Sequence, residues 1–319
     1  MKRYKPSEMA PGILYLQNDP EYLDLVCRTG ASSLFTELAD VGSWACATYE
    51  TLETVSLPEA EHVGEGAFFH CYSLREVYAP KLQSIDSSAF LSDHSLSSAC
   101  FPAAQYIGNS AFMYCYSLRT LCLPEVQFIS SYAFFSCDLE AVDLPKLSSA
   151  RSAIFGNNYR LSSANIPLLG AILEHLFASC SSLKFVNAPL ASIISQYAFR
   201  ECIGLESVNF PAAQTIWSSA FARCEALSVA SFPALIRLYS WAFRSCYNLV
   251  SLYLPGSSVV ILSNSNTFSS TPIRGYSVSA GQTGSIYVPA SLLTEYQAAT
   301  NWTYFSSRFV GLEEEEGTT

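Results

Sequence analysis

The sequence has little charge, little histidine and no long hydrophobic run. Only 14% of its 319 residues are charged, and the formal net charge is −10. A nucleic-acid-binding protein needs a basic face for phosphates, so this acidic balance argues against that class. No run of roughly 18 apolar residues occurs, so we expect no membrane span. Because 50% of the residues are hydrophobic, the chain can nevertheless form a substantial core.

Motifs that mark enzymes and cofactor sites are also missing from the sequence. The four histidines, His62, His70, His94 and His175, never form the H-x-x-x-H or H-E-x-x-H pattern of a zinc enzyme. There is no glycine-rich phosphate loop, no G-x-S-x-G and no C-x-x-C pair. We therefore predict no catalytic residue, no metal site, no cofactor and no enzymatic activity.

The N-terminus lacks the apolar core of a secretory signal peptide. Its first residues are positively charged, but the apolar stretch from Ile13 to Leu16 is too short, and Asn18, Asp19 and Glu21 interrupt the next stretch. We expect such a signal to be absent or already removed. The eleven cysteines are odd in number and widely spread, unlike the dense even framework of a small disulfide-rich domain.

The main feature of the sequence is a repeat with a 22-residue period. Ten prolines recur with this step, and a single step among them is shorter by one position. They are Pro58, Pro80, Pro102, Pro124, Pro145, Pro167, Pro189, Pro211, Pro233 and Pro255. A phenylalanine keeps the same step from Phe68 to Phe243, and a leucine follows nearly every one of them six residues later. A fixed period of about 20–29 residues predicts a leucine-rich-repeat-like solenoid, in which each unit buries its core by stacking on its neighbours.

One unit shows how a coil is built. Residues 118–124 have the L-x-x-L-x-L form of a repeat strand followed by proline. Strand alternation predicts that the leucines point inward and that Cys122 points outward, and Pro124 ends the strand because it has no N–H group. Residues 109–112 are expected to form a short helical or 3₁₀ turn on the opposite wall, with Phe112 in the interior.

These units resemble the BspA-like family of bacterial leucine-rich repeats, whose pattern is A-F-x-x-C-x-x-L-x-x-I-x-L-P-x-x-x-x-I. One of the units that carry it here is Ala67-Phe68, Cys71, Leu74, Val77, Ala79-Pro80 and Ile85. The match covers roughly residues 37–289; Cys46 takes a phenylalanine place, and Asp93 and Asn158 take cysteine places. The resemblance implies a right-handed solenoid. It also implies an extracellular or cell-surface protein used in adhesion, whose partner is a host matrix protein or another cell-surface protein.

We accordingly predict an α/β repeat fold: a right-handed leucine-rich-repeat-like solenoid with short parallel strands and short helical or 3₁₀ turns, capped at both ends. Residues 1–36 are expected to form an N-terminal cap. Residues 37–255 are expected to form ten leucine-rich repeats of 21–22 residues each. Residues 256–289 would form an irregular eleventh repeat. Residues 290–319 would form a capping helix, with leucines at helical spacing, and an acidic tail.

Seven cysteines recur three residues after the repeat phenylalanine: Cys71, Cys115, Cys137, Cys180, Cys202, Cys224 and Cys246. Stacking places them in a ladder with a step of about 4.8 Å, which would permit disulfides by distance. The simpler interpretation, which we favour, is a structural column of buried, inert thiols. Cys100 and Cys122 differ, because both fall at the outward strand position of neighbouring coils. They are either an unreactive exposed pair or a dithiol that joins under oxidation.

The outward strand positions offer a long, mostly small and polar face. From it we select Tyr78, Asp143, Phe185, Asn187, Asn209 and Tyr253 as candidate partner-binding residues. Asn165, Asn187 and Asn209 lie in register, so their amides could bond one another or bind a ligand. The predicted function is non-catalytic, adhesin-type protein binding. The alternative is a carbohydrate- or cell-wall-binding surface component, with Tyr78 and Tyr253 stacking on a glycan; a hydrolase has little support.

The opposite wall carries a second, weaker candidate. Arg200, Arg223 and Arg244 come at near-repeat spacing and form a basic stripe. Glu201 and Glu225 lie beside it, so we favour a solvated face of mixed charge.

Overall fold

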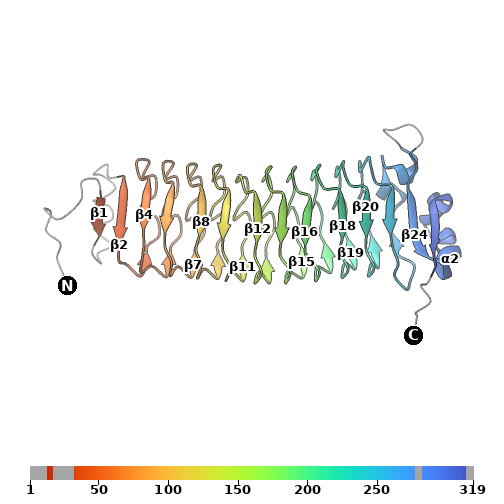
Figure 1. Ribbon diagram of the computed structural model, residues 1–319, viewed down its shortest axis with the longest axis horizontal. Coiled ribbons are helices and arrows are strands. Elements are labelled where there is room, and N and C mark those ends of the chain that lie inside the picture. Colours follow the sequence, from red (N-terminus) through yellow and green to blue (C-terminus); the bar gives the residue numbers. More distant parts are fainter. Residues whose placement is uncertain (1–12, 17–31, 277–281, 314–319) are drawn as a thin grey trace. The chain divides into compact units, whose positions relative to one another are not determined.

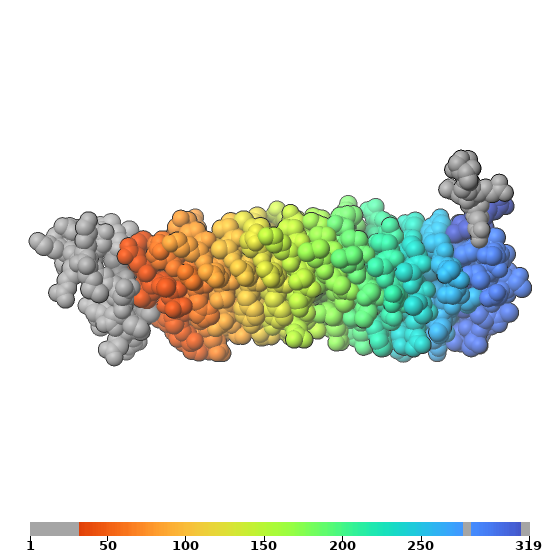
Figure 2. Space-filling model, turned by 90° about the horizontal axis from the view of Figure 1, so that it is seen from below, coloured from red at the N-terminus to blue at the C-terminus, as the bar shows by residue number. Residues whose placement is uncertain are grey.

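A computed structural model describes residues 13–16, 32–276 and 282–313, and the chain divides into two units, residues 1–150 and 151–319. Each unit is a stack of coils with parallel strands on two walls (Figure 1). In a space-filling view, successive coils within each unit pack directly against one another (Figure 2). The leucine-rich-repeat-like solenoid predicted from the 22-residue period is therefore present in both units.

In unit 1, the strands before each repeat proline form one wall and shorter strands form the other. The first wall holds β1 (Ile13–Leu16), β2 (Ser33–Thr36), β4 (Thr54–Ser56), β6 (Glu76–Tyr78), β8 (Ser98–Cys100), β10 (Thr120–Cys122) and β12 (Ala141–Asp143). The second wall is a six-stranded sheet of β3 (Asp40–Val41), β5 (His62–Val63), β7 (Ser84–Ile85), β9 (Tyr106–Ile107), β11 (Phe128–Ile129) and β13 (Ser149–Ala150). Neighbouring strands pair in register one repeat apart, as Val55 does with Val77.

Unit 2 repeats this plan. Its first wall holds β14 (Ser163–Asn165), β16 (Phe185–Asn187), β18 (Ser207–Asn209), β20 (Val229–Ser231), β22 (Ser251–Tyr253), β24 (Ser285–Pro289) and β25 (Phe309–Leu312). Its second wall is a five-stranded sheet of β15 (Ala171–Ile172), β17 (Ile193–Ile194), β19 (Thr215–Ile216), β21 (Arg237–Leu238) and β23 (Ile261–Leu262). Helical segments follow in η2 (Ser265–Phe268), η3 (Pro272–Arg274), η4 (Ala290–Leu292), α2 (Leu293–Ala298) and η5 (Trp302–Arg308).

Two segments bear on the predicted caps. Much of the expected N-terminal cap and residues 314–319 of the expected acidic tail lie outside the described residues. Within the 1–36 range, β1 and β2 pair in parallel and extend the strand wall instead of departing from it. At the other end, α2 falls inside the predicted helix, and Trp302 packs on Phe268 with its indole N–H donating to the Val260 carbonyl at 2.7 Å.

In each coil, the segment from the second-wall strand to the next first-wall strand forms a third wall, which we call the turn wall; residues 86–97 are one example. It is not helical in the regular repeats, which corrects the expected helical or 3₁₀ turns. Ser88 and Ser92 have positive φ angles of 57° and 63°, and the equivalent residues of other coils do the same. Each coil thus places two left-handed residues four positions apart in this wall. The N–H groups of Ser88, Phe90 and Ser92 all donate to carbonyls of the following coil at 2.8 Å. This wall is a ladder of turns, and it does not support the α/β label.

The core is a column of stacked phenylalanine rings. In unit 1, the ring of Phe90 lies 5.2 Å from Phe68 and 5.0 Å from Phe112, with planes within 9° of parallel. In unit 2, the column runs from Phe155 to Phe268 with spacings of 5.1 to 5.8 Å. These rings are fully buried. A repeat phenylalanine therefore contacts its counterparts in the coils on both sides.

The ladder cysteines lie beside this column and hydrogen-bond the backbone. All seven are buried, and each thiol donates to a carbonyl 25 residues earlier at 3.1 Å. Burial raises the pKa of the Cys180 thiol to about 12, so the group stays protonated and able to donate. These bonds thus tie each coil to the one before it, and all ten described cysteines are thiols.

Asp93 takes a cysteine place in this ladder, between Cys71 and Cys115. Its Oδ1 accepts the Cys71 N–H at 2.8 Å, and its buried Oδ2 has no hydrogen-bond partner. Burial holds the pKa of this carboxyl well above its usual value. The neutral acid matches a thiol, because it accepts with one atom and carries a proton to donate.

We predict that truncating a core ring costs far more than truncating its half-buried neighbour. Phe112→Ala should lower the free energy of unfolding by about 3–5 kcal/mol, because it empties a fully buried aromatic site. Phe69→Ala should cost far less, since Phe69 is half-buried at the edge of the turn wall. Urea midpoints of the two variants measure the difference, and equal losses would contradict the assigned register.

We also predict that Asp93 makes stability fall as the pH rises. Above the ordinary carboxyl pKa of about 3.9, the unfolded chain releases the Asp93 proton while the folded chain keeps it. Stability should therefore decrease by about 1.4 kcal/mol per pH unit until the folded-state pKa is reached. Asp93→Asn should remove this component when urea midpoints are measured from pH 4 to 8.

A matched variant in unit 2 serves as the control for Asp93. Asn158 holds the equivalent ladder place and is also fully buried. Asn158→Asp should introduce the same loss of stability with rising pH. Parallel pH profiles for the wild-type protein and Asp93→Asn would contradict the assignment of a buried neutral acid.

Candidate functional site

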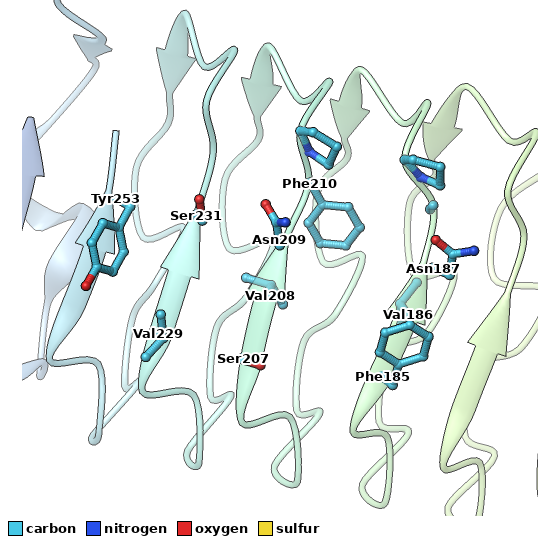
Figure 3. Close-up of a pocket in the computed structure, with 13 residues that line it drawn as sticks. Phe185, Val186, Asn187, Ser207, Val208, Asn209, Phe210, Val229, Ser231 and Tyr253 are labelled. Carbon is cyan, nitrogen blue, oxygen red and sulfur yellow. The ribbon is translucent and has the colours of Figure 1, made fainter. Parts of the chain in front are cut away.

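The strand wall of unit 2 has a shallow hollow of about 590 Å³ (Figure 3). Strands β16, β18, β20 and β22 line it. Four of the six candidate partner-binding residues lie in this lining: Phe185, Asn187, Asn209 and Tyr253. The other two, Tyr78 and Asp143, belong to unit 1. The structure therefore brings together the four candidates that share a unit.

The hollow arises because small side chains separate two aromatic ones. Phe185 projects from β16 and is 60% exposed, and Tyr253 projects from β22. Between them, β18 and β20 present Ser207 and Ser231, which leave the floor low. The depression is thus a difference in side-chain size on a regular sheet.

Tyr253 is held from one side only. Its ring stacks on Tyr287 of β24, with centroids 4.5 Å apart and planes 10° from parallel. Since β22 lies between β20 and β24, the other ring face turns toward Ser231 and the hollow. One face of a fixed tyrosine ring is therefore available to a ligand.

The asparagine row divides between an internal bond and an exposed amide. The Asn187 amide donates to Asn165 Oδ1 at 2.7 Å, and the two residues are register partners on β16 and β14. This is the amide-to-amide bonding that the spacing allows. Asn209 is exposed, and no side-chain hydrogen bond holds it within the described part of unit 2. Its amide is therefore the one in the row that is free to bind a ligand.

Unit 1 has a second, smaller hollow on its strand wall, of about 500 Å³. Tyr78, which is 60% exposed, and Glu76 line it together with Thr54, Ser56 and Ser98. Asp143 is exposed on β12 and lies outside this hollow. Tyr78 is thus the aromatic residue of a separate shallow site.

On the turn wall of unit 2, the arginine stripe is neutralised in part by Glu201. The Oε1 atom of Glu201 accepts from Arg200 at 3.1 Å and from Arg223 at 3.3 Å, and Arg200 lies over the Tyr197 ring. Arg244 is exposed farther along the wall. A solvated face of mixed charge, as the sequence suggested, accounts for this stripe.

Aromatic stacks on the outer surface were missed by sequence reasoning. In unit 1, the Tyr72, His94 and Tyr116 rings follow one another at 4.9 Å, and in unit 2 Trp217 stacks on Tyr239 at 4.4 Å. The available signal was the 22-residue spacing of these rings. Because the rings cover each other's faces and expose their edges, they give a ligand little flat surface to stack on.

The described residues offer neither a metal-binding cluster nor a membrane-spanning helix. Among residues 13–16, 32–276 and 282–313, no group of three or more histidine, cysteine, aspartate or glutamate side chains could hold a metal ion. None of the helices in the part of the chain that the structure describes has the length and apolar character needed to span a bilayer.

Comparisons with known proteins agree with the repeat pattern. The sequence model of the BspA type leucine rich repeat region matches residues 39–162 and 170–284 in six copies. No curated protein matches the sequence. A leucine rich cell surface protein from Faecalibacterium prausnitzii is 21% identical over 88% of this chain and 83% of its own, with a TM-score of 0.44. A leucine-rich repeat protein from Eubacterium ventriosum is 14% identical over 82% of this chain and 90% of its own, with a TM-score of 0.43. The family match covers most of the sequence, and the chain therefore belongs to the BspA-type leucine-rich repeat family.

Proposed function

We propose that this chain is a non-catalytic binding protein of the adhesin type, whose strand face contacts a protein partner. The observation that carries the proposal is the hollow of unit 2, with an aromatic residue at either end and a floor of small polar and apolar side chains. Protein interfaces place most of their binding energy in such aromatic anchors, with polar groups around them. Adhesion and a cell-surface location are inferences from the family.

The dimensions of the hollow suit an extended segment of a partner. Phe185 and Tyr253 stand three strand spacings apart, which is about 14 Å. An extended peptide advances about 3.3 Å per residue, so about four residues would span the distance. The exposed Asn209 amide and the Ser207 and Ser231 hydroxyls would bond its backbone between the two rings.

A glycan is the second candidate, and the Tyr253 ring is the observation that favours it. Stacking on Tyr287 fixes this ring, so little conformational entropy would be lost when its open face meets a sugar ring. Exposed Tyr78 offers a comparable surface in unit 1. Each tyrosine would then serve its own unit as a stacking surface for a cell-wall or carbohydrate ligand.

We predict that Phe185→Ala combined with Asn187→Ala abolishes binding to a protein partner, weakening it at least about 30-fold if the pair forms a hot spot. The melting temperature should change little, because Phe185 is exposed and the Asn165–Asn187 bond is only partly buried. Surface plasmon resonance against a panel of purified host matrix proteins measures the effect.

The matched control changes the opposite wall. The triple variant Arg200→Ala, Arg223→Ala, Arg244→Ala should keep full binding. If it loses binding while the strand-face variant retains it, the turn wall is the functional surface. A glycan array run in parallel separates the two ligand classes, because Tyr253→Ala would abolish an array signal that Arg244→Ala leaves intact.

A further inference from the structure

Cys100 and Cys122 are placed unlike the other described cysteines. Cys100 ends β8 and Cys122 ends β10, and the two residues are register partners in parallel strands. Both are exposed, whereas the remaining described cysteines are buried. Since register partners point to the same side of a sheet, the two thiols stand next to each other on the strand face of unit 1.

The strand geometry permits a bond between them. Parallel strands are spaced about 4.8 Å apart, which lies inside the Cα separations of about 4.4–6.8 Å that disulfides span. The preferred Cβ separation of about 3.8 Å is shorter than the strand spacing, so the bond would draw β8 and β10 together. A strained, exposed disulfide is readily reduced, which is the behaviour of a reversible one.

We propose that Cys100 and Cys122 form a redox-active dithiol that reduces small disulfides and closes to a disulfide between neighbouring coils. In the first step, the thiolate of one cysteine attacks a sulfur of the small disulfide. A mixed disulfide forms, and the leaving thiolate takes up the proton that the cysteine released. In the second step, the other cysteine attacks the protein sulfur of that mixed disulfide and expels the second small thiol.

The reaction balances without a further reagent. The two cysteine thiols lose two electrons and two protons, and the small disulfide gains both to become two thiols. Burial, together with the neighbouring Cys122 thiol, raises the pKa of Cys100 to about 11. Thiolate at Cys100 is therefore scarce near neutral pH, and we expect exchange to be slow and to accelerate as the pH rises.

The charges along the same wall indicate which disulfides react best. Glu76 on β6 and Asp143 on β12 are exposed on the strands next to β8 and β10. The nearby Arg119 is paired with Asp138 at 3.3 Å. An acidic surface attracts cations and repels anions, so the substrate class is a small disulfide that carries amines, such as cystamine.

The test treats the folded 319-residue chain with cystamine, in a Cys27→Ser background because Cys27 lies outside the described residues. We expect the intact mass to fall by two hydrogens, and peptide mapping to find Cys100 linked to Cys122. Cys100→Ser and Cys122→Ser should each stop at a mixed disulfide that retains one reagent half. The ladder thiols should react only after denaturation.

Charge selectivity is measured in the same assay. Cystamine should react roughly fivefold faster than the anionic glutathione disulfide, and Asp143→Asn or added salt should reduce that ratio. The proposal is overturned if wild-type protein carries separate adducts on both cysteines with no internal link. It is also overturned if Cys100 and Cys122 react only when the chain is unfolded. Neither result would bear on the binding face of unit 2.

Discussion

Backbone hydrogen bonding between coils is the constraint on which the rest of each unit depends. On the strand walls this bonding forms parallel ladders. On the turn wall, where two residues of each coil have positive φ angles, N–H groups again donate to carbonyls of the next coil. Phe112 N–H, for example, donates to Ala133 O at 2.8 Å. A residue and its counterpart one repeat later are therefore held about 4.8 Å apart. Every residue type that recurs with the period becomes a column, whether it is buried phenylalanine, buried thiol or exposed ring.

The same constraint explains why the ladder position is so selective. The side chain there must be small, must donate to a carbonyl of the previous coil and must lie among apolar groups, and the thiol meets all three needs. Asp93 is buried at the same place but accepts a hydrogen bond from the Cys71 N–H instead of donating one, and burial holds the pKa of its carboxyl well above its usual value. A single carboxyl in a column of neutral groups thus links the stability of unit 1 to pH. Asn158 fills the equivalent place in unit 2 with a neutral amide that donates to Phe155 O of its own coil at 2.9 Å.

The period allowed much of this to be predicted, and its failures have physical causes. Strand positions, the phenylalanine column and the exposure of Cys100 and Cys122 follow from counting in repeat-length steps. The turn wall was predicted wrongly because its left-handed positions mostly hold residues such as serine, tyrosine and histidine, and glycine marks only one of them, at Gly66. The Tyr253–Tyr287 stack was missed, although the predicted eleventh repeat ends at Pro289, because the separation of the two rings along the chain departs from the 22-residue period. The hollow was missed because its depth depends on comparing the side chains of four strands.

Binding and stability are separable on such a face, because strand alternation assigns them to different residues. On β18 and β20, Ser207, Asn209 and Val229 are exposed, while Val208 and Ala230 between them are buried. Outward positions can therefore change in size and charge while the inward ones keep the column intact. An aromatic residue opposite small ones makes a hollow, and two outward cysteines in register place two thiols side by side. A uniform scaffold can in this way carry chemically different sites, each set by the outward residues of a few neighbouring coils.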